Sequence, residues 1–297
     1  MTNFATAASR NVTVIVPTYH RAHLLERTIP SYLQPEVNRL ILVDDCSPDD
    51  TAQVAAALMR QDSRIQYLRN DVNRKQTHSK NRGLELADTE FVYFGDDDSL
   101  LSEGAMACLL ETLHTTQADL VGAAALYLLN GESDAELQAR RRWSDQADEI
   151  SYLPGLRFDV SVRAPSGLEI PICQAAFLAR LDTVRALRFD TGYIGNCFRE
   201  ETDFLVACRA KGARIVLETR ATQTNLPPSV ATGGARGRSR LRYEWYSLYN
   251  TVRFLKKNHR ALRAIDARCH PPIMLAAYVG SRFSGLARKV RNRLTGT

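Results

Sequence analysis

The sequence predicts an α/β fold in which a mainly parallel sheet is flanked by helices and followed by a C-terminal helical extension. Three observations support this prediction. The chain has 297 residues and 44% hydrophobic content, enough to bury a substantial core. Its first hundred residues alternate short β-branched runs with runs of helical apolar spacing. Helices that separate successive strands act as right-handed crossovers, which place those strands parallel in one sheet.

The order of elements in this first part follows from the same runs. The helix at residues 51–60 has the clearest start, because Ser47 can cap it, Pro48 suits its first turn and Asp50 follows three residues after the serine. In an open parallel sheet, ligands bind beyond the carboxyl ends of the strands, so the segments after these strands are expected to face one crevice. The predicted strands lie at residues 12–16, 39–43, 64–68 and 91–95, and the predicted helices at residues 20–33, 51–60 and 78–87.

The second part of the chain has a looser pattern. Residues 130–167 are irregular, charged and rich in arginine, which indicates an insertion or a substrate loop. The proline, glycine and serine content of residues 227–240 predicts a mobile loop. We divide the chain into a main domain at residues 1–232 and a basic loop with a helical extension at residues 233–297. Helices are predicted at residues 102–114, 173–186, 200–210 and 243–259, and strands at residues 119–128 and 214–218.

Charge is divided unevenly along the chain. The net charge is +6, but residues 233–297 carry fifteen lysines and arginines against two acids. That segment is therefore +13, and residues 1–232 are −7. A basic tail on a mildly acidic body indicates an anionic partner, such as a membrane surface, a nucleic acid or a phosphorylated substrate.

Several common classes of protein lack support in the sequence. No apolar run reaches the length of about 20 residues that crosses a bilayer, and the polar N-terminus lacks the pattern of a secretory leader. The six cysteines show no CxxC or zinc-finger spacing, so free thiols in a reducing cytoplasm are expected. The sequence has no GxxxxGKS/T phosphate loop, no GxGxxG after the first strand, no HExxH and no GxSxG.

Asp96, Asp97 and Asp98 directly follow an apolar strand and form the strongest local signal. Three adjacent carboxylates repel one another unless a cation or several hydrogen-bond donors compensate. Hard divalent ions such as Mg²⁺ and Mn²⁺ prefer carboxylate oxygens and commonly share phosphate oxygens with a substrate. A solvated acidic turn would show the same triplet, so the interpretation as a metal site depends on the acids elsewhere in the chain.

Two further pairs of acids follow or begin predicted elements. Asp44 and Asp45 repeat the arrangement of an apolar strand followed by carboxylates. Glu200 and Glu201 stand at a predicted helix start, where acids usually match the helix dipole. A carboxylate aimed at a crevice that binds phosphate and metal could instead serve as the general base for a hydroxyl nucleophile.

Together these segments resemble the inverting GT-A glycosyltransferases of family 2. Each matching motif is weak alone, but five in the right order at plausible spacing are specific. The matches, in chain order, are residues 12–21 with the first strand and nucleotide loop, 43–49 with the VDDxSxD segment, 79–84 with the ARNxG helix, 94–98 with the DxD motif, and 189–190 followed by 200–203 with the acidic acceptor-side motif.

The resemblance implies an enzyme that transfers a sugar from a nucleoside-diphosphate sugar to an acceptor hydroxyl, with inversion. It implies a divalent metal, Mn²⁺ or Mg²⁺, bound by Asp98 with Asp96. Glu201 would be the general base, with Glu200 as the alternative. The residues implied to bind the nucleotide sugar are Pro17, Thr18, Tyr19, Arg21, Asp44, Asp45, Lys80, Arg82, Asp96 and Asp97.

The resemblance also implies separate roles within this set. Asp45 would contact the base, Asp97 would hold the ribose, and Lys80 and Arg82 would meet phosphate charge. The family often places a histidine after the strand that follows the acidic helix, but residues 221–225 contain none. The basic loop at residues 233–242 would then clamp the diphosphate instead.

The implied partners are a donor, for which UDP-sugar is favoured with GDP and dTDP open, and a glycan, lipid-linked or small-molecule acceptor. A cytoplasmic protein is expected, with peripheral contact to the inner face of the membrane through the basic tail. A helix packed on the domain with a solvated basic face fits the tail equally well. Nucleic acid is not expected as a partner, because the crevice is acidic. A metal-dependent nucleotidyltransferase and a non-catalytic nucleotide-sugar or anion-binding protein are the alternatives.

Overall fold

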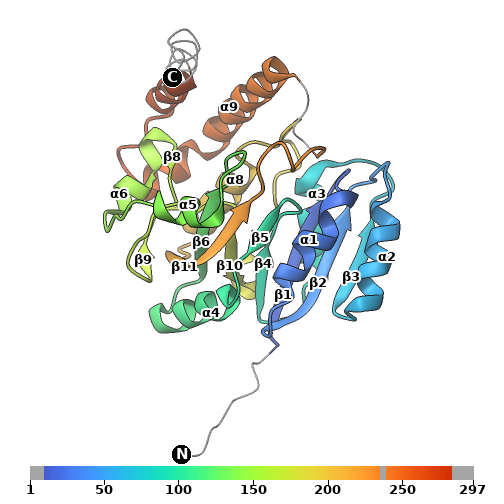
Figure 1. Ribbon diagram of the computed structural model, residues 1–297. Helices are drawn as coiled ribbons and strands as arrows, with labels where there is room; N and C mark the ends of the chain where they lie inside the picture. The colour runs from blue at the N-terminus through green and yellow to red at the C-terminus, as the bar shows by residue number, and fades with distance from the viewer. Residues whose placement is uncertain (1–9, 235–238, 283–297) are drawn as a thin grey trace, which may run out of the picture.

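The computed structural model describes residues 10–234 and 239–282. Its centre is a nine-stranded sheet in which β9 pairs with β11 and the other strands follow the order β3-β2-β1-β4-β10-β6-β11-β5 (Figure 1). The strands of this sheet are β1 (Val12–Thr18), β2 (Val37–Asp44), β3 (Ile65–Arg69), β4 (Phe91–Phe94), β5 (Ser99–Leu101), β6 (Leu120–Tyr127), β9 (Leu168–Glu169), β10 (Phe177–Arg180) and β11 (Ile215–Asn225). A separate hairpin joins β7 (Ser151–Tyr152) to β8 (Arg157–Phe158).

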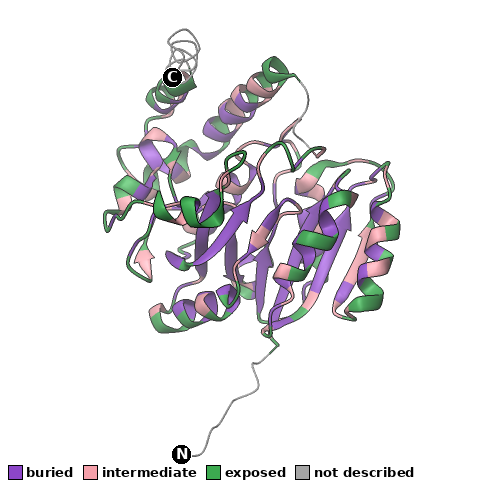
Figure 2. Cartoon of the chain, in the orientation of Figure 1, coloured by how far each residue is buried: buried purple, intermediate pink, exposed green. Residues whose placement is uncertain are grey.

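Helices cover both faces of the sheet, and the strands between them are buried (Figure 2). On one face pack α1, α2 and α4; on the other pack α3 and α8, with α9 outside α8 (Figure 1). Alternate residues of β1 divide between the two cores, with Ile15 in one and Val14 in the other. The helices are α1 (Ala22–Tyr32), α2 (Thr51–Gln61), α3 (Lys75–Leu86), α4 (Ala105–Thr116), α5 (Asp134–Ala139), α6 (Ala147–Ile150), α7 (Leu181–Val184), α8 (Glu200–Ala210) and α9 (Arg240–Ile265).

The α/β class and the parallel first half are confirmed. The strand β1 pairs in parallel with β2 and β4, and β2 pairs in parallel with β3. The second half of the sheet is mixed, because β10 runs antiparallel to both β4 and β6, while β6 and β11 are parallel. Helices α1 and α3 begin at Ala22 and Lys75, so the predicted starts at residues 20 and 78 are each displaced by a few residues.

The helix predicted at residues 173–186 is wrong. Residues 177–180 form the strand β10, and only the short helix α7 follows it. Phe177 and Ala179 enter the core under α3 and α8, whereas Leu178 enters the core under α1 and α4. A strand that is apolar on both faces has no alternation to reveal it, so its apolar run resembles a helix segment. Residues 177–180 form a strand because β10 hydrogen-bonds to β4 on one side and to β6 on the other.

The strand β11 extends well beyond the predicted residues 214–218. It reaches Asn225, with an irregularity in its pairing between Glu218 and Thr222. The short strand β5, which was not predicted, pairs with its last three residues. The extension brings Gln223 to the edge of the sheet where β4 ends, and this position matters for the site described below.

The C-terminal extension is helical where it is described, in α9 and at residues 271–282. Tyr278, in the basic tail for which membrane contact and packing on the domain were both predicted, is buried and joins the main core, so this side chain packs on the domain. Residues 283–297 of the basic tail lie outside the described residues. All six cysteines are free thiols, as predicted. None of the helices in the described ranges has the length and apolar character needed to span a bilayer.

Candidate active site

The acidic triplet occupies the turn between β4 and β5. The carbonyl oxygen of Asp96 accepts a hydrogen bond from the Tyr32 hydroxyl at 3.0 Å, so α1 fixes one end of the turn. The carbonyl oxygen of Asp98 accepts one from the Leu226 amide at 2.9 Å, so the segment after β11 fixes the other. The side chain of Gln223 donates to Asp96 Oδ2 at 3.2 Å. Two distant segments, α1 and the end of β11, therefore hold the acidic triplet at the sheet edge.

Burial raises the pKa of two of these acids. Desolvation raises the pKa of Asp96 to about 7, although the Lys80 ammonium opposes the rise. Desolvation also raises the pKa of Asp97 to about 6, although the Arg21 guanidinium opposes it, and the neighbouring Asp98 adds to it. Carboxyls that keep protons near neutral pH lack sufficient positive charge around them. A cation arriving with a ligand would displace these protons, so it would bind more tightly as pH rises through 6 to 7.

Arg21 pairs with the triplet at the start of α1. Its Nη1 lies 3.0 Å from Asp98 Oδ2 and 3.9 Å from Asp97 Oδ1. The side chain is buried, and its Nε has no hydrogen-bond partner among the described residues. Because a guanidinium carries five donors in a planar fork, Arg21 can hold a carboxylate and still offer N–H groups to a phosphate oxygen.

Lys80 joins the two predicted acidic groups. It lies on the buried face of α3, and its Nζ is 2.8 Å from Glu200 Oε1 and 2.5 Å from Glu201 Oε1 at the start of α8. Burial opposes charge on Lys80, but Glu200, Glu201 and Asp96 together raise its pKa above the usual value. The same ammonium lowers the pKa of Asp96, against the effect of burial. The structure therefore brings Lys80, Asp96 and the two glutamates into one electrostatic cluster.

The two glutamates differ in access. The Glu200 side chain is 1% exposed and also accepts a hydrogen bond from Gln76 Nε2 at 2.8 Å. The Glu201 side chain is 25% exposed. Burial raises the pKa of Glu200 to about 8, although the Lys80 ammonium opposes the rise. Glu200 is thus enclosed by protein, whereas Glu201 can meet a ligand.

Asp44 and Asp45 are held by protein groups close to their own strand. Asp44 accepts hydrogen bonds from the Ser47 amide, the Tyr67 hydroxyl and the Arg69 guanidinium. Burial and the bond to Asp44 raise the pKa of Tyr67 to about 12. These contacts fix the turn after β2 and occupy both oxygens of Asp44.

Asp45 holds the turn that leads into α3. Its Oδ1 accepts from the Asn70 side chain at 2.9 Å and the Arg74 amide at 2.8 Å, and its Oδ2 accepts from the Lys75 amide at 2.7 Å. Lys75 has a φ of 72°, and these bonds keep its backbone in that left-handed conformation. Asp45 therefore positions residues 70–75 beside the nucleotide loop predicted at residues 17–19.

That loop lies at the end of β1, next to the triplet. Pro17 and Thr18 are buried and pair with β2. The Tyr19 amide donates to Asp97 Oδ2 at 3.4 Å, and the His20 amide donates to the Ser47 hydroxyl at 2.9 Å. The loop is thus connected both to the triplet and to the turn after β2.

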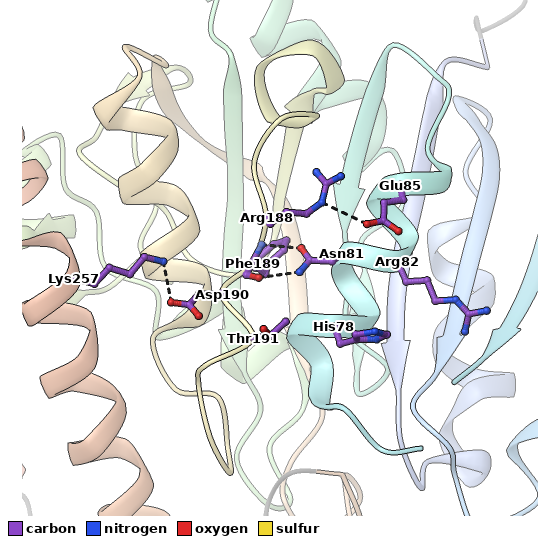
Figure 3. A pocket seen from close by; sticks show the side chains of 9 residues that line it. All are labelled: His78, Asn81, Arg82, Glu85, Arg188, Phe189, Asp190, Thr191 and Lys257. Carbon is purple, nitrogen blue, oxygen red and sulfur yellow. Dashed lines mark hydrogen bonds and ion pairs between the residues drawn. The ribbon is translucent and has the colours of Figure 1, made fainter. Parts of the chain in front are cut away.

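Arg82 lies apart from this cluster. Its Nη1 donates to the Arg69 carbonyl and to Asn70 Oδ1, and Figure 3 shows it pointing away from Asn81 and Phe189. Residues two apart on a helix face different directions, so Lys80 and Arg82 cannot both meet the same phosphate. Arg82 instead lines a groove of about 700 Å³ (Figure 3), together with His78, Asn81, Glu85, Arg188, Phe189, Asp190, Thr191 and Lys257.

The segment that follows β11 covers part of the site and was not anticipated in this position. The Val230 carbonyl and the Thr232 hydroxyl lie 3.3 Å from His23 Nε2, and the Arg21 guanidinium donates to the Gly233 carbonyl at 3.5 Å. The sequence predicted a mobile loop at residues 227–240 and a role at the diphosphate for residues 233–242, but it did not predict the contacts with His23 and Arg21. Gln223, which contacts Asp96, was also missed; it stands in the segment where the family's histidine was sought. Gln76, which donates to Glu200, was missed as well, because nothing in the sequence distinguishes it from other polar residues of α3.

No three His, Cys, Asp or Glu side chains within residues 10–234 and 239–282 are arranged to hold a metal ion by themselves. Asp96, Asp97 and Asp98 at the end of β4 and Glu201 at the start of α8 are the carboxylates that could meet a ligand here. The arrangement can neutralise a diphosphate with Arg21 and a cation, and it can accept a proton at Glu201.

Known proteins resemble this chain in sequence and in fold. The protein is 41% identical over 115 residues to GalNAc(5)-diNAcBac-PP-undecaprenol beta-1,3-glucosyltransferase of Campylobacter jejuni, a match that covers 37% of each chain. It is 28% identical over 117 residues to poly(ribitol-phosphate) beta-N-acetylglucosaminyltransferase TarP of Staphylococcus aureus, covering 38% of this chain and 36% of TarP. The matches thus span little more than a third of these relatives.

Solved structures match over more of the chain. The mannosyltransferase PcManGT of Pyrobaculum calidifontis, in complex with GDP-Man and Mn²⁺, superposes with a TM-score of 0.59 at 17% identity and covers 91% of this chain and 69% of its own. The S. aureus TarS fragment 1–349 with UDP-GlcNAc superposes at 0.56 and 13% identity, covering 92% of each chain. These likenesses confirm the GT-A fold.

The sequence model of glycosyl transferase family 2 matches residues 13–161, which is half of the chain. That range contains the predicted nucleotide loop, the acids after β2, Lys80 and the acidic triplet. With the fold in agreement, the chain belongs to glycosyl transferase family 2.

Proposed function

We propose that this protein transfers a sugar from a nucleoside-diphosphate sugar to an acceptor hydroxyl, with inversion and with a divalent cation. One observation carries the proposal: Lys80 links Glu201 to the acidic triplet, so a proton acceptor and an anionic turn lie at one edge of the sheet. In this proposal the main domain at residues 1–232 binds both substrates. The segment before Gly233, whose carbonyl accepts from Arg21, would lie over the donor.

The carboxylates suit a divalent cation that arrives with the donor. Such ions are commonly held by one or two carboxylates, with phosphate oxygens and water completing the shell. Asp98 and Asp96 would provide the carboxylates. Burial raises the pKa of Asp96, and a bound cation would favour its ionised form. Bound there, Mn²⁺ or Mg²⁺ acts as a Lewis acid that offsets the charge of the leaving diphosphate.

The residues of the chain supply the remaining steps. Glu201 removes the proton of the acceptor hydroxyl as its oxygen forms a bond to the anomeric carbon. The bond from that carbon to the diphosphate breaks on the opposite face, and the nucleoside diphosphate leaves with the electron pair. Lys80 holds Glu201 Oε1, and no described residue donates to Glu201 Oε2, which is open to the acceptor. Arg21 steadies the diphosphate.

The donor side of the proposal rests on the loop and the turn described above. Pro17, Thr18, Tyr19 and the turn held by Asp45 would enclose the base, and Asp97 would hold the ribose. UDP-sugar is the first candidate, since TarS has been solved with UDP-GlcNAc; GDP-sugar is the second, since PcManGT has been solved with GDP-Man. For the acceptor we favour a lipid-linked glycan, because the C. jejuni relative is named for an undecaprenol-linked substrate.

The proposal predicts metal-dependent release of one nucleoside diphosphate from a panel of nucleotide sugars. We expect turnover with Mn²⁺ or Mg²⁺, no turnover with EDTA, and a loss of about 100-fold or more in Asp98→Ala, because this variant removes a carboxylate that holds the cation. Release of product and binding of donor are measured for each nucleotide sugar. If no nucleotide sugar binds or turns over with either metal, the proposed enzyme is ruled out, and a non-catalytic binding role takes its place.

A second prediction concerns the loop over the site. Gly233 has a φ of +85°, and a Cβ there would collide with the carbonyl oxygen of His20. We expect Gly233→Ala to undock the segment from Arg21 and raise the KM for donor about tenfold, the equivalent of strain of about 1–2 kcal/mol. Gly131→Ala is the control, because Gly131 has a φ of +79° but no atom within 4 Å of an added Cβ. An unchanged KM for donor in Gly233→Ala would show that the segment at Gly233 does not contribute to donor binding.

A further inference from the structure

The exposed face of α9 carries an apolar and aromatic stripe that the proposed chemistry does not use. Leu241, Trp245 and Tyr249 follow one another at intervals of four residues, so they lie on one face of the helix. Their exposed fractions are 84%, 60% and 42%. The opposite face, with Ser247, Asn250 and Phe254, is buried against the domain. Apolar side chains grouped in this way usually mark a contact surface.

Basic residues continue the stripe along the same face. Lys256 and Arg260 are exposed, and no ion pair joins either of them to an acid in the parts of the chain that the structure describes. Arg240 and Arg242 flank Leu241 and are also exposed. A shallow groove of about 430 Å³ runs beside the stripe, lined by Tyr249, Val252, Arg253, Lys256 and Lys257. The face therefore combines an apolar end with uncompensated positive charge.

We propose that this face of α9 docks on an anionic lipid bilayer. Tryptophan and tyrosine favour the boundary between headgroups and acyl chains, and leucine can enter the outer acyl region. Lysine and arginine beside them are attracted to anionic headgroups. The pairing of interfacial aromatics with excess positive charge favours a bilayer over a second copy of the chain, whose own α9 would carry the same charge. The stripe lies on α9, within the basic segment at residues 233–297.

Contacts between α9 and α8 make this docking relevant to the active site. Asp203 of α8 accepts from Lys257 Nζ at 2.7 Å and from Asn258 Nδ2 at 2.6 Å. Asp190 is bonded to both Arg253 and Lys257 at 2.9–3.0 Å. Burial opposes it, but the Gly192 amide together with these two cations lowers the pKa of Asp190 to about 2. Glu201 lies two residues before Asp203. A bilayer bound to α9 would therefore hold the helix of the general base near a lipid-linked acceptor, a consequence that rests on the proposed function.

The two tryptophans of the chain allow a direct test. Trp245 is 60% exposed on the stripe, and Trp143 is 64% exposed in the insertion far along the chain. In Trp143→Phe, the emission of Trp245 should shift to the blue when vesicles of phosphatidylcholine and phosphatidylglycerol are added, and less with phosphatidylcholine alone. In Trp245→Phe, the emission of Trp143 should not shift. Shifts that are absent in both proteins, or equal in both, overturn the proposal.

Sedimentation with the same vesicles measures the strength of docking. We expect Trp245→Ser and the double variant Lys256→Glu/Arg260→Glu each to bind anionic vesicles at least about tenfold more weakly, whereas Trp143→Ser binds as the unaltered protein does. Nucleotide-sugar hydrolysis in solution should be the same in all four proteins, so loss of docking is distinguished from loss of catalysis. Two results overturn the proposal in favour of another occupant: a Trp245 emission already blue and protected from acrylamide without lipid, or a dimer that Trp245→Ser dissolves.

Discussion

Glu201→Gln is expected to abolish sugar transfer while donor binding persists. Glutamine keeps the shape of the side chain and can still contact Lys80 but cannot accept the acceptor's proton. A lost general base costs about 100- to 10,000-fold in rate. Measurement of kcat with acceptor, together with the Kd for donor and metal, separates chemistry from binding. Because transfer needs the base and donor binding does not, we expect kcat to fall and the Kd to change less than about threefold.

Two controls accompany this variant. Glu103→Gln neutralises an exposed acid outside the cluster and should leave kcat unchanged. Glu200→Gln removes the enclosed acid, which the geometry assigns to positioning Lys80 and not to proton transfer. Its kcat should fall far less than that of Glu201→Gln. If kcat falls further in Glu200→Gln than in Glu201→Gln while both variants are equally stable, Glu200 is the general base and Glu201 positions Lys80.

Lys80→Met is expected to produce the largest loss of stability. Lys80 is 1% exposed, and its removal leaves the Glu200 and Glu201 carboxyls in a buried region without their cation. Removing one partner of a buried ion pair typically costs about 3–5 kcal/mol. The free energy of unfolding, measured with urea, should fall by about 3 kcal/mol. Lys256→Met, at an exposed position, should change it by less than about 0.5 kcal/mol.

The pH dependence of this loss identifies its cause. The pKa of Glu200 is already raised to about 8 in the folded protein, and without Lys80 it would rise further. A carboxyl with a raised folded pKa contributes stability below its unfolded pKa and loses it as pH rises through the folded value. Lys80→Met should therefore be closer to the unaltered protein at pH 5 than at pH 9. A deficit that does not change with pH would point instead to the lost cation–π contact between the Lys80 ammonium and the Phe189 ring.

The sequence was a good guide where local pattern and family motif agree. The first four parallel strands follow from apolar runs separated by helical ones, and the acidic triplet was found because it follows one of those strands. The relation between Lys80 and Arg82 was also open to prediction, since the helical period separates residues two apart. This difference in direction was overlooked because Lys80 and Arg82 belong to the same family motif and were given the same role.

Other features depended on contacts between distant segments. No pattern near residues 173–186 distinguishes a helix from a strand buried on both faces. Asp44 and Asp45 appear equivalent to the acidic triplet in sequence, yet Tyr67, Arg69 and Asn70 occupy their oxygens. The docking of residues 226–234 on His23 and Arg21 joins positions some two hundred residues apart. Such pairings are fixed only when the whole sheet has formed.

The antiparallel strand β10 sets a limit on how this protein can be divided. It sits between β4 and β6, and so joins the donor half of the sheet to the half that carries β11. A fragment that ended before Phe177 would retain every residue proposed to bind the nucleotide, yet it would leave the buried edges of β4 and β6 without a partner. Open apolar edges of this kind recruit other chains. Engineering that exchanges acceptor modules should therefore keep β10 with the donor half, or the product will aggregate before its specificity can be tested.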